Sequence, residues 1–332
     1  MRKIYYDEKW KKLLTPEIVS LLTTIHEFKG EQTVFVERYG NELEQLAEAT
    51  HIQSVEAFNS IEGIYICDER LKLIALDKTM PKTRKEFEIA GYRDVLNTIN
   101  YNYEHIPIKS SIILNLHRDL NKFNVAGIGG KYKENGDMLE MINELCDDYD
   151  EITRNELVDP LLVIPMFILD FMCIHPFGDD NGRMSRLLTS LLLYRAGYLV
   201  GKYISVEKLM ENLKDTYYEA VQASSKHWHK DENNYEPFVR FMLGIISNAY
   251  LEFFARIRLS IMNGLSKPEH VREIIKETLG TITKTEIMKK CPNISQITIQ
   301  RTLADLLAKG EIVKIGGGRY TKYTWNWSRG DE

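Results

Sequence analysis

Twelve consecutive residues, His175–Arg186, bring a base, two carboxylates, an asparagine and two arginines together at one place in the chain. The apolar run Leu161–Ile174 precedes them, and the helix-forming run Met184–Tyr194 follows. This order predicts a junction in which Asp179–Gly182 form the first turn of a new helix. The backbone N–H groups of a first helical turn have no partner within the helix, so they readily bind anions. We therefore expect a phosphate site.

The charged side chains of this junction have the types and spacing that a nucleotide requires. Arg183 and Arg186 lie three residues apart, which places both guanidinium groups on one helical face, where they can bind phosphate oxygens at two levels. Asp179 is a hard oxygen ligand that can hold Mg²⁺ beside the phosphates. The imidazole of a histidine has an ordinary pKa of about 6.5, so His175 can accept the proton of an attacking hydroxyl at neutral pH.

Each of these residues also has a purely structural interpretation. Asp179–Asn181 fits a helix cap, Phe177 a core residue and His175 an ordinary loop histidine. Together they are not explained in this way, because a capping turn requires neither an imidazole nor two arginines at phosphate spacing. The stretch resembles the signature of the Fic family, HxFx(D/E)GNGRxxR, except at Asp180, where glycine is usual. Aspartate tolerates a positive φ better than most residues, but its charge would lie close to the phosphates.

The resemblance implies a nucleotidyl transfer. His175 would be the general base, Asp179 would hold Mg²⁺, and Asn181 with the loop amides would hold the α-phosphate. The other nucleotide-binding residues that the resemblance implies are Gly182, Arg183 and Arg186, with the two arginines at the distal phosphates. The usual product in such relatives is a target hydroxyl that carries AMP, with pyrophosphate released. Some relatives use other nucleotides or transfer phosphocholine.

A second resemblance concerns the base of the nucleotide. The amphipathic segment Asp215–Ser224 contains Tyr217 and Tyr218, which resemble a tyrosine pair that lines the base pocket in Fic relatives. Core packing explains these two tyrosines equally well. Ser225 stands where relatives often have an asparagine, so the sequence does not specify the base.

Glu62 is placed unfavourably in its own segment. Val55–Ile61 has helical character, and Gly63 is suited to the position just after a helix end. A carboxylate in a last turn faces the negative end of the helix dipole at a cost of about 0.3–1 kcal/mol, so Glu62 requires either solvent or a cation. The stretch resembles the N-terminal inhibitory helix of one Fic class, (S/T)xxxE(G/N), whose glutamate pairs with the second arginine of the signature, here Arg186. Phe58 departs from that pattern, because it stands at the Ser/Thr position.

The composition is that of an ordinary soluble globular protein. Of the 332 residues, 44% are hydrophobic and 27% are charged, which suffices for two or three domains with cores of their own. The four cysteines are scattered without a CxxC pair, so neither a disulfide framework nor a zinc site is indicated. The N-terminus lacks the apolar segment of a signal peptide, and the run Leu161–Ile174 contains Asp170 and is too short to span a bilayer. We therefore expect a cytoplasmic protein without a membrane partner.

Residues 1–100 are expected to be mostly helical. Thr15 is suited to cap a helix that ends at Gly30. The core of the Fic resemblance follows at residues 101–262. Within it, the glycine-rich stretch Gly127–Met141 fits a small β-hairpin and resembles the family's flap, whose edge can pair with the backbone of a target. An ordinary surface loop is the alternative.

The pattern changes in the last part of the chain, residues 265–332. Three short helical units precede a strand, three glycines at Gly316–Gly318 and a second strand, which is the order of a winged helix-turn-helix domain. Ser295 would cap the third helix. The side chains expected on the outer, DNA-facing side of that helix are Gln296, Gln300 and Arg301. This part has 12 basic and 8 acidic residues, a net charge of +4 against −5 for the whole chain. Because DNA-binding domains are usually more basic, a protein-interaction or dimerisation module is the alternative.

These observations predict a mostly α-helical protein with three parts, residues 1–100, 101–262 and 265–332. The implied function is transfer of AMP from ATP, with Mg²⁺, to a hydroxyl side chain of a target protein or of the chain itself, under autoinhibition by Glu62. Two alternatives stay open. One is an enzyme that removes AMP or carries out both reactions, with Glu62 positioning the attacking water. The other is a DNA-binding regulator whose Fic core senses a ligand. A homodimer is compatible with either function.

Overall fold

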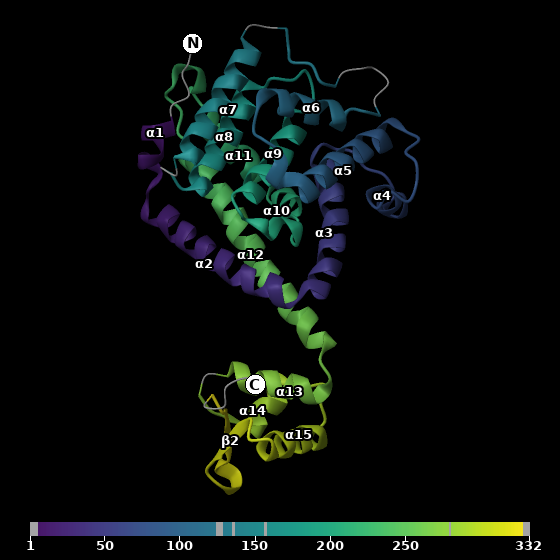
Figure 1. Cartoon of the computed structure of the whole chain (residues 1–332), viewed down its shortest axis with the longest axis vertical. Coiled ribbons are helices and arrows are strands. Elements are labelled where there is room, and N and C mark those ends of the chain that lie inside the picture. The colour runs from purple at the N-terminus through teal and green to yellow at the C-terminus, as the bar shows by residue number, and fades with distance from the viewer. Residues whose placement is uncertain (1–5, 124–128, 135–136, 156–157, 279, 328–332) are drawn as a thin grey trace. The chain divides into compact units, whose positions relative to one another are not determined.

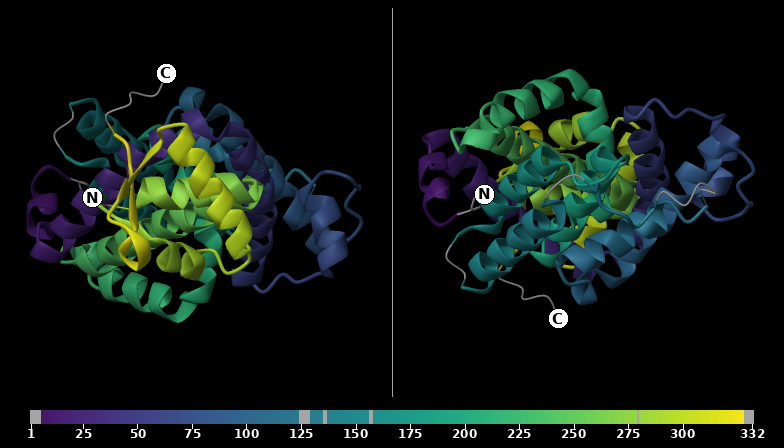
Figure 2. Two further views of the ribbon diagram at one scale, coloured as in Figure 1. Left: turned by 90° about the horizontal axis from the view of Figure 1, so that it is seen from below. Right: turned by 90° about the horizontal axis from the view of Figure 1, so that it is seen from above.

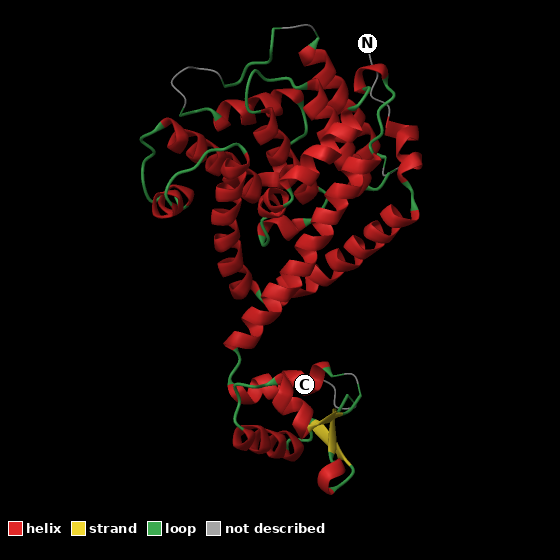
Figure 3. Cartoon of the chain, turned by 180° about the vertical axis from the view of Figure 1, so that it is seen from behind, coloured by secondary structure: helices red, strands yellow, loops and turns green. Residues whose placement is uncertain are grey.

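The computed structural model describes the chain except residues 1–5, 124–128, 135–136, 156–157, 279 and 328–332. The chain divides into two compact units, Met1–Phe254 and Ala255–Glu332, which are described separately (Figure 1). Helices make up most of the described residues, and the strands among them belong to one three-stranded sheet in the C-terminal unit (Figure 3). The prediction of a mostly α-helical fold is confirmed.

The N-terminal unit is built from helices of very different lengths. In chain order its α-helices are α1 (Tyr6–Lys9), α2 (Pro16–Arg38), α3 (Gly40–Ile61), α4 (Asp68–Ala75), α5 (Arg84–Asn102), α6 (Ser110–Leu120), α7 (Met138–Arg154), α8 (Pro160–Ile174), α9 (Asn181–Arg195), α10 (Val206–Asn212), α11 (Lys214–Ser225) and α12 (Glu236–Gly264), the last of which continues into the C-terminal unit.

Helices α8 and α9 form the core of this unit. Every residue of α8 from Leu161 to Phe171 is buried, and so is every residue of α9 from Arg183 to Tyr194. A helix buried on all sides must be surrounded by other elements. Helices α5, α7 and α11 pack against this pair, and α4 lies at the periphery of the unit in both views of Figure 2. The stretch His175–Arg186 therefore joins two core helices.

Helix α2 begins as expected but ends later. Thr15 caps it by accepting a hydrogen bond from a backbone N–H of the first turn at 3.3 Å. Gly30 lies inside the helix, so the expectation that it ends the helix is wrong. The later turns pack against α12, where the rings of Phe35 and Phe254 lie 5.5 Å apart. This tertiary contact outweighs the roughly 0.5–1 kcal/mol that a glycine costs inside a helix.

Helix α3 ends just before Glu62. Glu62 has left the helical conformation, and Gly63 has a φ of 75°, which is the conformation predicted for a residue after a helix end. The backbone N–H groups of Gly63 and Ile64 donate to carbonyl oxygens of the last helical turn at 3.0 and 2.9 Å. The position of Glu62 is therefore set by a hydrogen-bonded helix end.

The hairpin predicted at Gly127–Met141 is not supported where the structure describes it. Residues 129–134 contain no strand, and α7 begins at Met138, while residues 124–128 and 135–136 lie outside the described chain. The helix starts this early because its apolar residues recur at helical spacing and are buried along one face, as at Ile142, Leu145 and Tyr149.

Within the described chain, α12 is long and apolar enough to cross a membrane. The stretch that meets these criteria is Glu236–Leu259, which is longer than the run Leu161–Ile174 considered above. More than half of its most apolar part is buried inside the protein. Because core helices of globular proteins have the same length and composition, this helix is weak evidence for a membrane span.

The C-terminal unit combines three helices with the small antiparallel sheet. Its elements after α12 are α13 (Lys267–Glu277), β1 (Ile282–Thr283), α14 (Lys284–Lys290), α15 (Gln296–Ala308), β2 (Ile312–Ile315) and β3 (Lys322–Trp325). The strand order is β1-β3-β2, and Ile312 pairs with Trp325. Ser295 caps α15 by accepting from the N–H of Thr298 at 3.2 Å. The three helices and the last two strands follow in the predicted order, and β1 is a further strand that was not predicted. The assignment to the winged-helix class stays a prediction.

Candidate active site

The loop between α8 and α9, residues 175–180, has a fixed backbone. Helix α8 stops because His175 takes a left-handed conformation with φ 53°, and Asp180 does the same before α9 with φ 67°. Asn181 spans the loop: its side-chain oxygen accepts from the N–H of Phe177 at 2.9 Å, and its amide nitrogen donates to the carbonyl oxygen of Phe177 at 2.7 Å. These bonds hold two residues in a backbone conformation that most side chains disfavour.

Phe177 anchors the loop in the core. Its ring is fully buried and stacks on His117 of α6, with centroids 3.8 Å apart and planes at 10°. Tyr132 stacks with it at 5.2 Å, and the Tyr132 hydroxyl donates to the carbonyl oxygen of Ser110 at 2.6 Å. The segment around Tyr132 is thus tied both to the loop and to the start of α6.

A cleft of about 360 Å³ lies beside the loop. It brings together five of the residues that the sequence singled out, namely His175, Asp179, Asn181, Gly182 and Arg183. Glu62 from the end of α3 lines the same cleft, as do Arg84 and Glu88 from α5. Glu88 was missed from the sequence, because nothing in the pattern of α5 distinguishes a cleft residue from a surface one.

The second arginine of the signature, Arg186, is paired with Glu62. A terminal nitrogen of the Arg186 guanidinium donates to a carboxylate oxygen of Glu62. Arg186 is only 4% exposed, and its guanidinium lies over the ring of Phe58 with 4.7 Å to the ring centroid. A β-carbon at Gly182 would lie 2.9 Å from the same carboxylate, so glycine is needed there for the approach of Glu62.

Phe58, which stands where the inhibitory pattern has Ser or Thr, contacts Arg186 through its ring. It is fully buried and stacks on Tyr92 of α5 at 3.4 Å, so it presents an aromatic face to Arg186. A cation over an aromatic face is stabilised by about 0.5–2 kcal/mol when it is desolvated. The phenylalanine therefore supports Arg186 through its ring.

Arg183 is also neutralised, by residues of its own loop and of α5. A terminal nitrogen of its guanidinium donates to Asp180, and the other lies 3.6 Å from a carboxylate oxygen of Glu88. The second oxygen of Asp180 accepts from the side-chain amide of Asn121 at 2.7 Å. Asp180 and Arg183 are 7% and 6% exposed, so their pairing is largely screened from water. The aspartate at the glycine position thus holds an arginine of the signature.

His175 contacts a second residue that the sequence did not reveal. Its Nδ1 lies 2.8 Å from the amino group of Lys133 and 3.2 Å from the side-chain amide of Asn181. The backbone N–H of Lys133 donates to the carbonyl oxygen of Pro176 at 2.9 Å, which fixes Lys133 beside the ring. Burial and the charge of Lys133 both lower the pKa of His175, so the neutral, basic form is favoured.

Asp179 is suited to a metal ion without forming a complete metal site. One of its carboxylate oxygens accepts from the N–H of Asp180 at 2.9 Å. No group of three or more His, Cys, Asp or Glu side chains in the described chain is arranged to hold a metal. Mg²⁺ is usually bound by one or two carboxylates together with substrate phosphates, so a single aspartate at this place fits it.

The tyrosine pair does not line the described cleft. Tyr217 is buried among Phe238, Phe241 and Tyr218, and its hydroxyl donates to the sulfur of Met172 at 3.3 Å. Tyr218 is 47% exposed. The core-packing interpretation accounts for Tyr217 in this conformation, and a role at the base stays a prediction for both tyrosines.

The central part of the N-terminal unit matches a known family of domains. The family model described as Fic/DOC family matches residues 107–193, which include the loop and both of its helices. The chain contains a Fic/DOC domain.

Curated relatives of this Fic domain match only a part of the chain. A protein adenylyltransferase Fic of Culex quinquefasciatus is 30% identical over 115 residues, which are 35% of this chain and 21% of that protein. A protein adenylyltransferase Fic of Aedes aegypti is 36% identical over 86 residues, 26% of this chain and 15% of that protein. The chain thus spans about a fifth or less of the length of these two relatives.

Solved structures share the fold more widely. A Fic family protein from Desulfovibrio desulfuricans G20 has a TM-score of 0.60 at 20% identity and covers 96% of this chain and 98% of its own. Fic-1 of C. elegans, residues 134–508, has a TM-score of 0.62 at 19% identity over 75% of this chain and 76% of its own. Glu62 and Glu88 lie outside the matched residues 107–193, so the N-terminal helices complete the cleft of the Fic domain.

Proposed function

We propose that the chain transfers AMP from ATP to a hydroxyl side chain of a target protein, and that Glu62 restrains this reaction. The observation that carries the proposal is that His175, the start of α9 and Arg183 line one cleft together with Glu62, the partner of Arg186. The Fic/DOC domain and the relatives named protein adenylyltransferase support it.

In the proposed reaction, His175 removes the proton of the target hydroxyl as the oxygen attacks the α-phosphorus of ATP. The bond between the α-phosphorus and the bridging oxygen breaks, and pyrophosphate leaves. The backbone N–H groups at the start of α9 stabilise the charge on the α-phosphate. Asn181 contributes by holding the loop, because its side chain is already bonded to Phe177 and lies near His175. Mg²⁺, held by Asp179, would neutralise charge on the phosphates.

The ion pair between Glu62 and Arg186 supplies the restraint. An arginine that is bonded to a carboxylate cannot also bind the distal phosphate with the same nitrogens. ATP would then lie with its triphosphate displaced, and the α-phosphorus would miss the in-line position that attack requires. The basal rate of transfer is therefore low until Glu62 is withdrawn.

Incubation of the full chain with ATP labelled at the α-phosphate tests the proposal. The expected result is protein-bound label, on the chain itself or on a protein of an added lysate, that requires a divalent cation and His175. Absence of label from both the wild-type chain and Glu62→Gly would refute the proposal. Release of AMP from a pre-labelled target would instead favour the removing activity, which the position of Glu62 in the same cleft as His175 also permits.

A second function is proposed for the C-terminal unit, namely binding of duplex DNA. The observation in its favour is the polar face of α15, on which Gln296, Gln300 and Arg301 are exposed. Full-length chain should bind duplex DNA with an affinity that falls as salt rises, because phosphate contacts release counterions. Arg301→Ala should weaken this binding, and an absence of binding at low salt would favour a protein-interaction module.

A further inference from the structure

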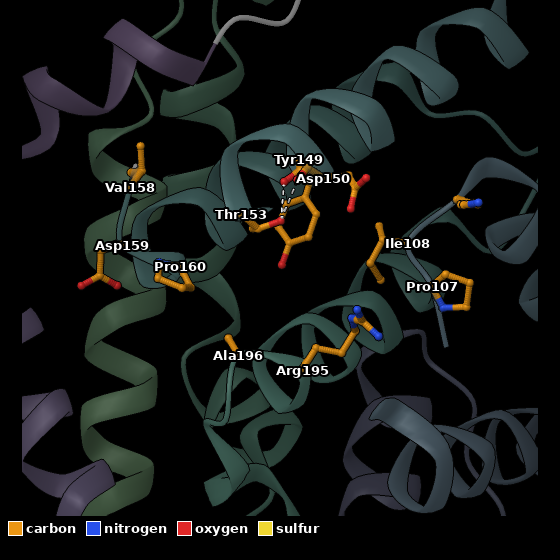
Figure 4. A pocket seen from close by; sticks show the side chains of 11 residues that line it. Pro107, Ile108, Tyr149, Asp150, Thr153, Val158, Asp159, Pro160, Arg195 and Ala196 are labelled. Atoms are coloured by element: carbon orange, nitrogen blue, oxygen red, sulfur yellow. Dashed lines mark hydrogen bonds between the residues drawn. The ribbon is translucent and has the colours of Figure 1, made fainter. Parts of the chain in front are cut away.

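A second cavity of the N-terminal unit lies apart from the motif cleft. Its volume is about 640 Å³, and among the described residues the two cavities share none of their lining. The segment before α6, helix α7, the start of α8 and the end of α9 surround it (Figure 4). Cavities of this size commonly bind small organic molecules.

The walls of this cavity combine apolar side chains with polar and charged ones. Pro107, Ile108, Val158 and Pro160 line it. The side chain of Tyr149 is only 6% exposed, and its hydroxyl points into the open centre of the view in Figure 4. That hydroxyl forms no hydrogen bond with any residue that the structure describes. The hydroxyl faces the cavity and is not enclosed in the core, so it is a donor that a ligand can use.

The acidic residues of the cavity are already engaged. Asp159 accepts from the backbone N–H of Leu161 at 2.9 Å and lies 2.7 Å from Nε2 of His26. Asp150 forms an ion pair with Arg154 one turn further along α7. Each carboxylate thus has a partner of its own, and the Asp150–Arg154 pair is the more exposed of the two.

The basic residues, by contrast, have donors to spare. Arg195 uses a single terminal nitrogen, Nη1, to donate to the backbone carbonyl oxygens of Tyr103, Glu104 and Ile106 at 3.3, 3.1 and 2.9 Å. Its Nε and Nη2 make no hydrogen bond in the described part of the chain. The same is true of the amino group of Lys109. A guanidinium that is already fixed by three bonds loses little freedom when it binds an anion.

We propose that this cavity binds a small monocarboxylate with an apolar body. The body lies against Ile108, Val158 and the two prolines, and the acid group is bound by the Tyr149 hydroxyl, Arg195 and Lys109. The proposal does not depend on the reaction assigned to the motif cleft, because it uses none of that cleft's residues. Burial also raises the pKa of Tyr149, so its hydroxyl stays a donor at neutral pH.

Isothermal titration of the full chain with 2-naphthoate tests the proposal, with 2-naphthamide as a neutral ligand of nearly the same shape. One molecule of naphthoate should bind per chain, and naphthamide should bind about tenfold more weakly, because a hydrogen bond to a charged group is stronger than one to a neutral group. Tyr149→Phe and Lys109→Met should each weaken naphthoate binding by about tenfold. Tyr101→Phe, at an exposed tyrosine outside the cavity, should leave it unchanged.

Three results would overturn the proposal. They are equal affinity for naphthoate and naphthamide, unchanged naphthoate binding in both Tyr149→Phe and Lys109→Met, and loss of binding in Arg186→Ala, which would place the ligand in the motif cleft. Tyr149→Phe removes only a hydroxyl that has no described partner, so the variant should fold. A thermal unfolding curve like that of the wild type verifies this.

Discussion

The two arginines of the signature are neutralised in different ways. Arg186 is paired with Glu62, a residue 124 positions away at the end of α3, whereas Arg183 is paired with Asp180, three positions away in its own loop. We refer to Glu62 with Arg186 as the helix pair and to Asp180 with Arg183 as the loop pair. Withdrawal of α3 would open the helix pair without any change in the loop. The loop pair moves with the phosphate site itself, so only a competing ligand or a substitution separates it.

This difference has an energetic basis. A buried ion pair is hard to break by removing one partner, because the other charge is left desolvated. For the helix pair, the phosphates of a bound nucleotide would replace the carboxylate that departs. For the loop pair, Asp180 would stay beside the phosphates and repel them, and Glu88 at 3.6 Å adds to this charge. We therefore propose that the helix pair is a reversible restraint and that the loop pair is a constant reduction of phosphate affinity.

The largest effect is expected at His175, because the effects of the helix pair and of the loop pair on transfer can be measured only while the base is present. His175→Ala in the Glu62→Gly background should lower incorporation of labelled AMP by roughly 10²–10⁴-fold, because the general base is lost. ATP affinity, measured by calorimetry, should be nearly unchanged, since the arginines and the loop amides hold the nucleotide. Transfer at the native rate would show that another group serves as the base.

The helix pair should have the next largest effect. Glu62→Gly should raise self-labelling roughly 5- to 150-fold. This is the range of fold-changes that corresponds to typical coupling free energies of about 1–3 kcal/mol. Glu62→Gln keeps the size of the side chain and removes its charge, so a similar rise would assign the restraint to charge. Arg186→Ala should lower labelling even in the Glu62→Gly background. Labelling that is unchanged in Glu62→Gly would show that the helix pair is not a restraint.

The loop pair should have a smaller effect, on ATP affinity. Asp180→Asn should tighten ATP binding by about tenfold, or on the order of 1.4 kcal/mol, because a carboxylate that competes for Arg183 is removed. Calorimetry in the His175→Ala background avoids turnover. Asp119→Asn, at a half-buried aspartate of α6 that pairs with Arg118, is the matched control. Weaker binding in Asp180→Asn would mean that Asp180 orients Arg183 for the phosphates. A double variant with Glu62→Gly should show additive effects if the two pairs are independent.

The smallest effect is expected at Lys133, and it concerns pH. His175 must be neutral to accept a proton, and the charge of Lys133 lowers its pKa after the larger effect of burial. Lys133→Met removes that charge and raises the pKa, so at a given acidic pH more of the ring is protonated. The acid limb of the pH–rate profile should therefore move to higher pH in Lys133→Met. Lys131→Met, at an exposed lysine of the same segment, should leave the profile unchanged, and an unmoved limb in Lys133→Met would refute this role.

Local signals in the sequence were sufficient for most of the loop and the helix ends beside it. Thr15 and Ser295 cap their helices, Gly63 adopts its positive φ, and α8 passes into α9 within His175–Arg186. These features depend on hydrogen bonds between residues a few positions apart, so residue type and spacing determine them. The same reasoning placed both arginines on one helix, which is α9. The predicted start of this helix at Asp179 is wrong, because Asp180 is left-handed and α9 begins at Asn181.

Only the tertiary structure decided which distant groups meet these residues. Gly30 stays helical because α12 packs behind it, Phe58 supports Arg186 through its ring, and Lys133 reaches His175 from a segment for which a hairpin was predicted. Nothing in the sequence of α5 indicates that Glu88 lies near Arg183. Such contacts join residues tens of positions apart, and their partners are set by how the helices pack, which the periodicity of each helix does not specify.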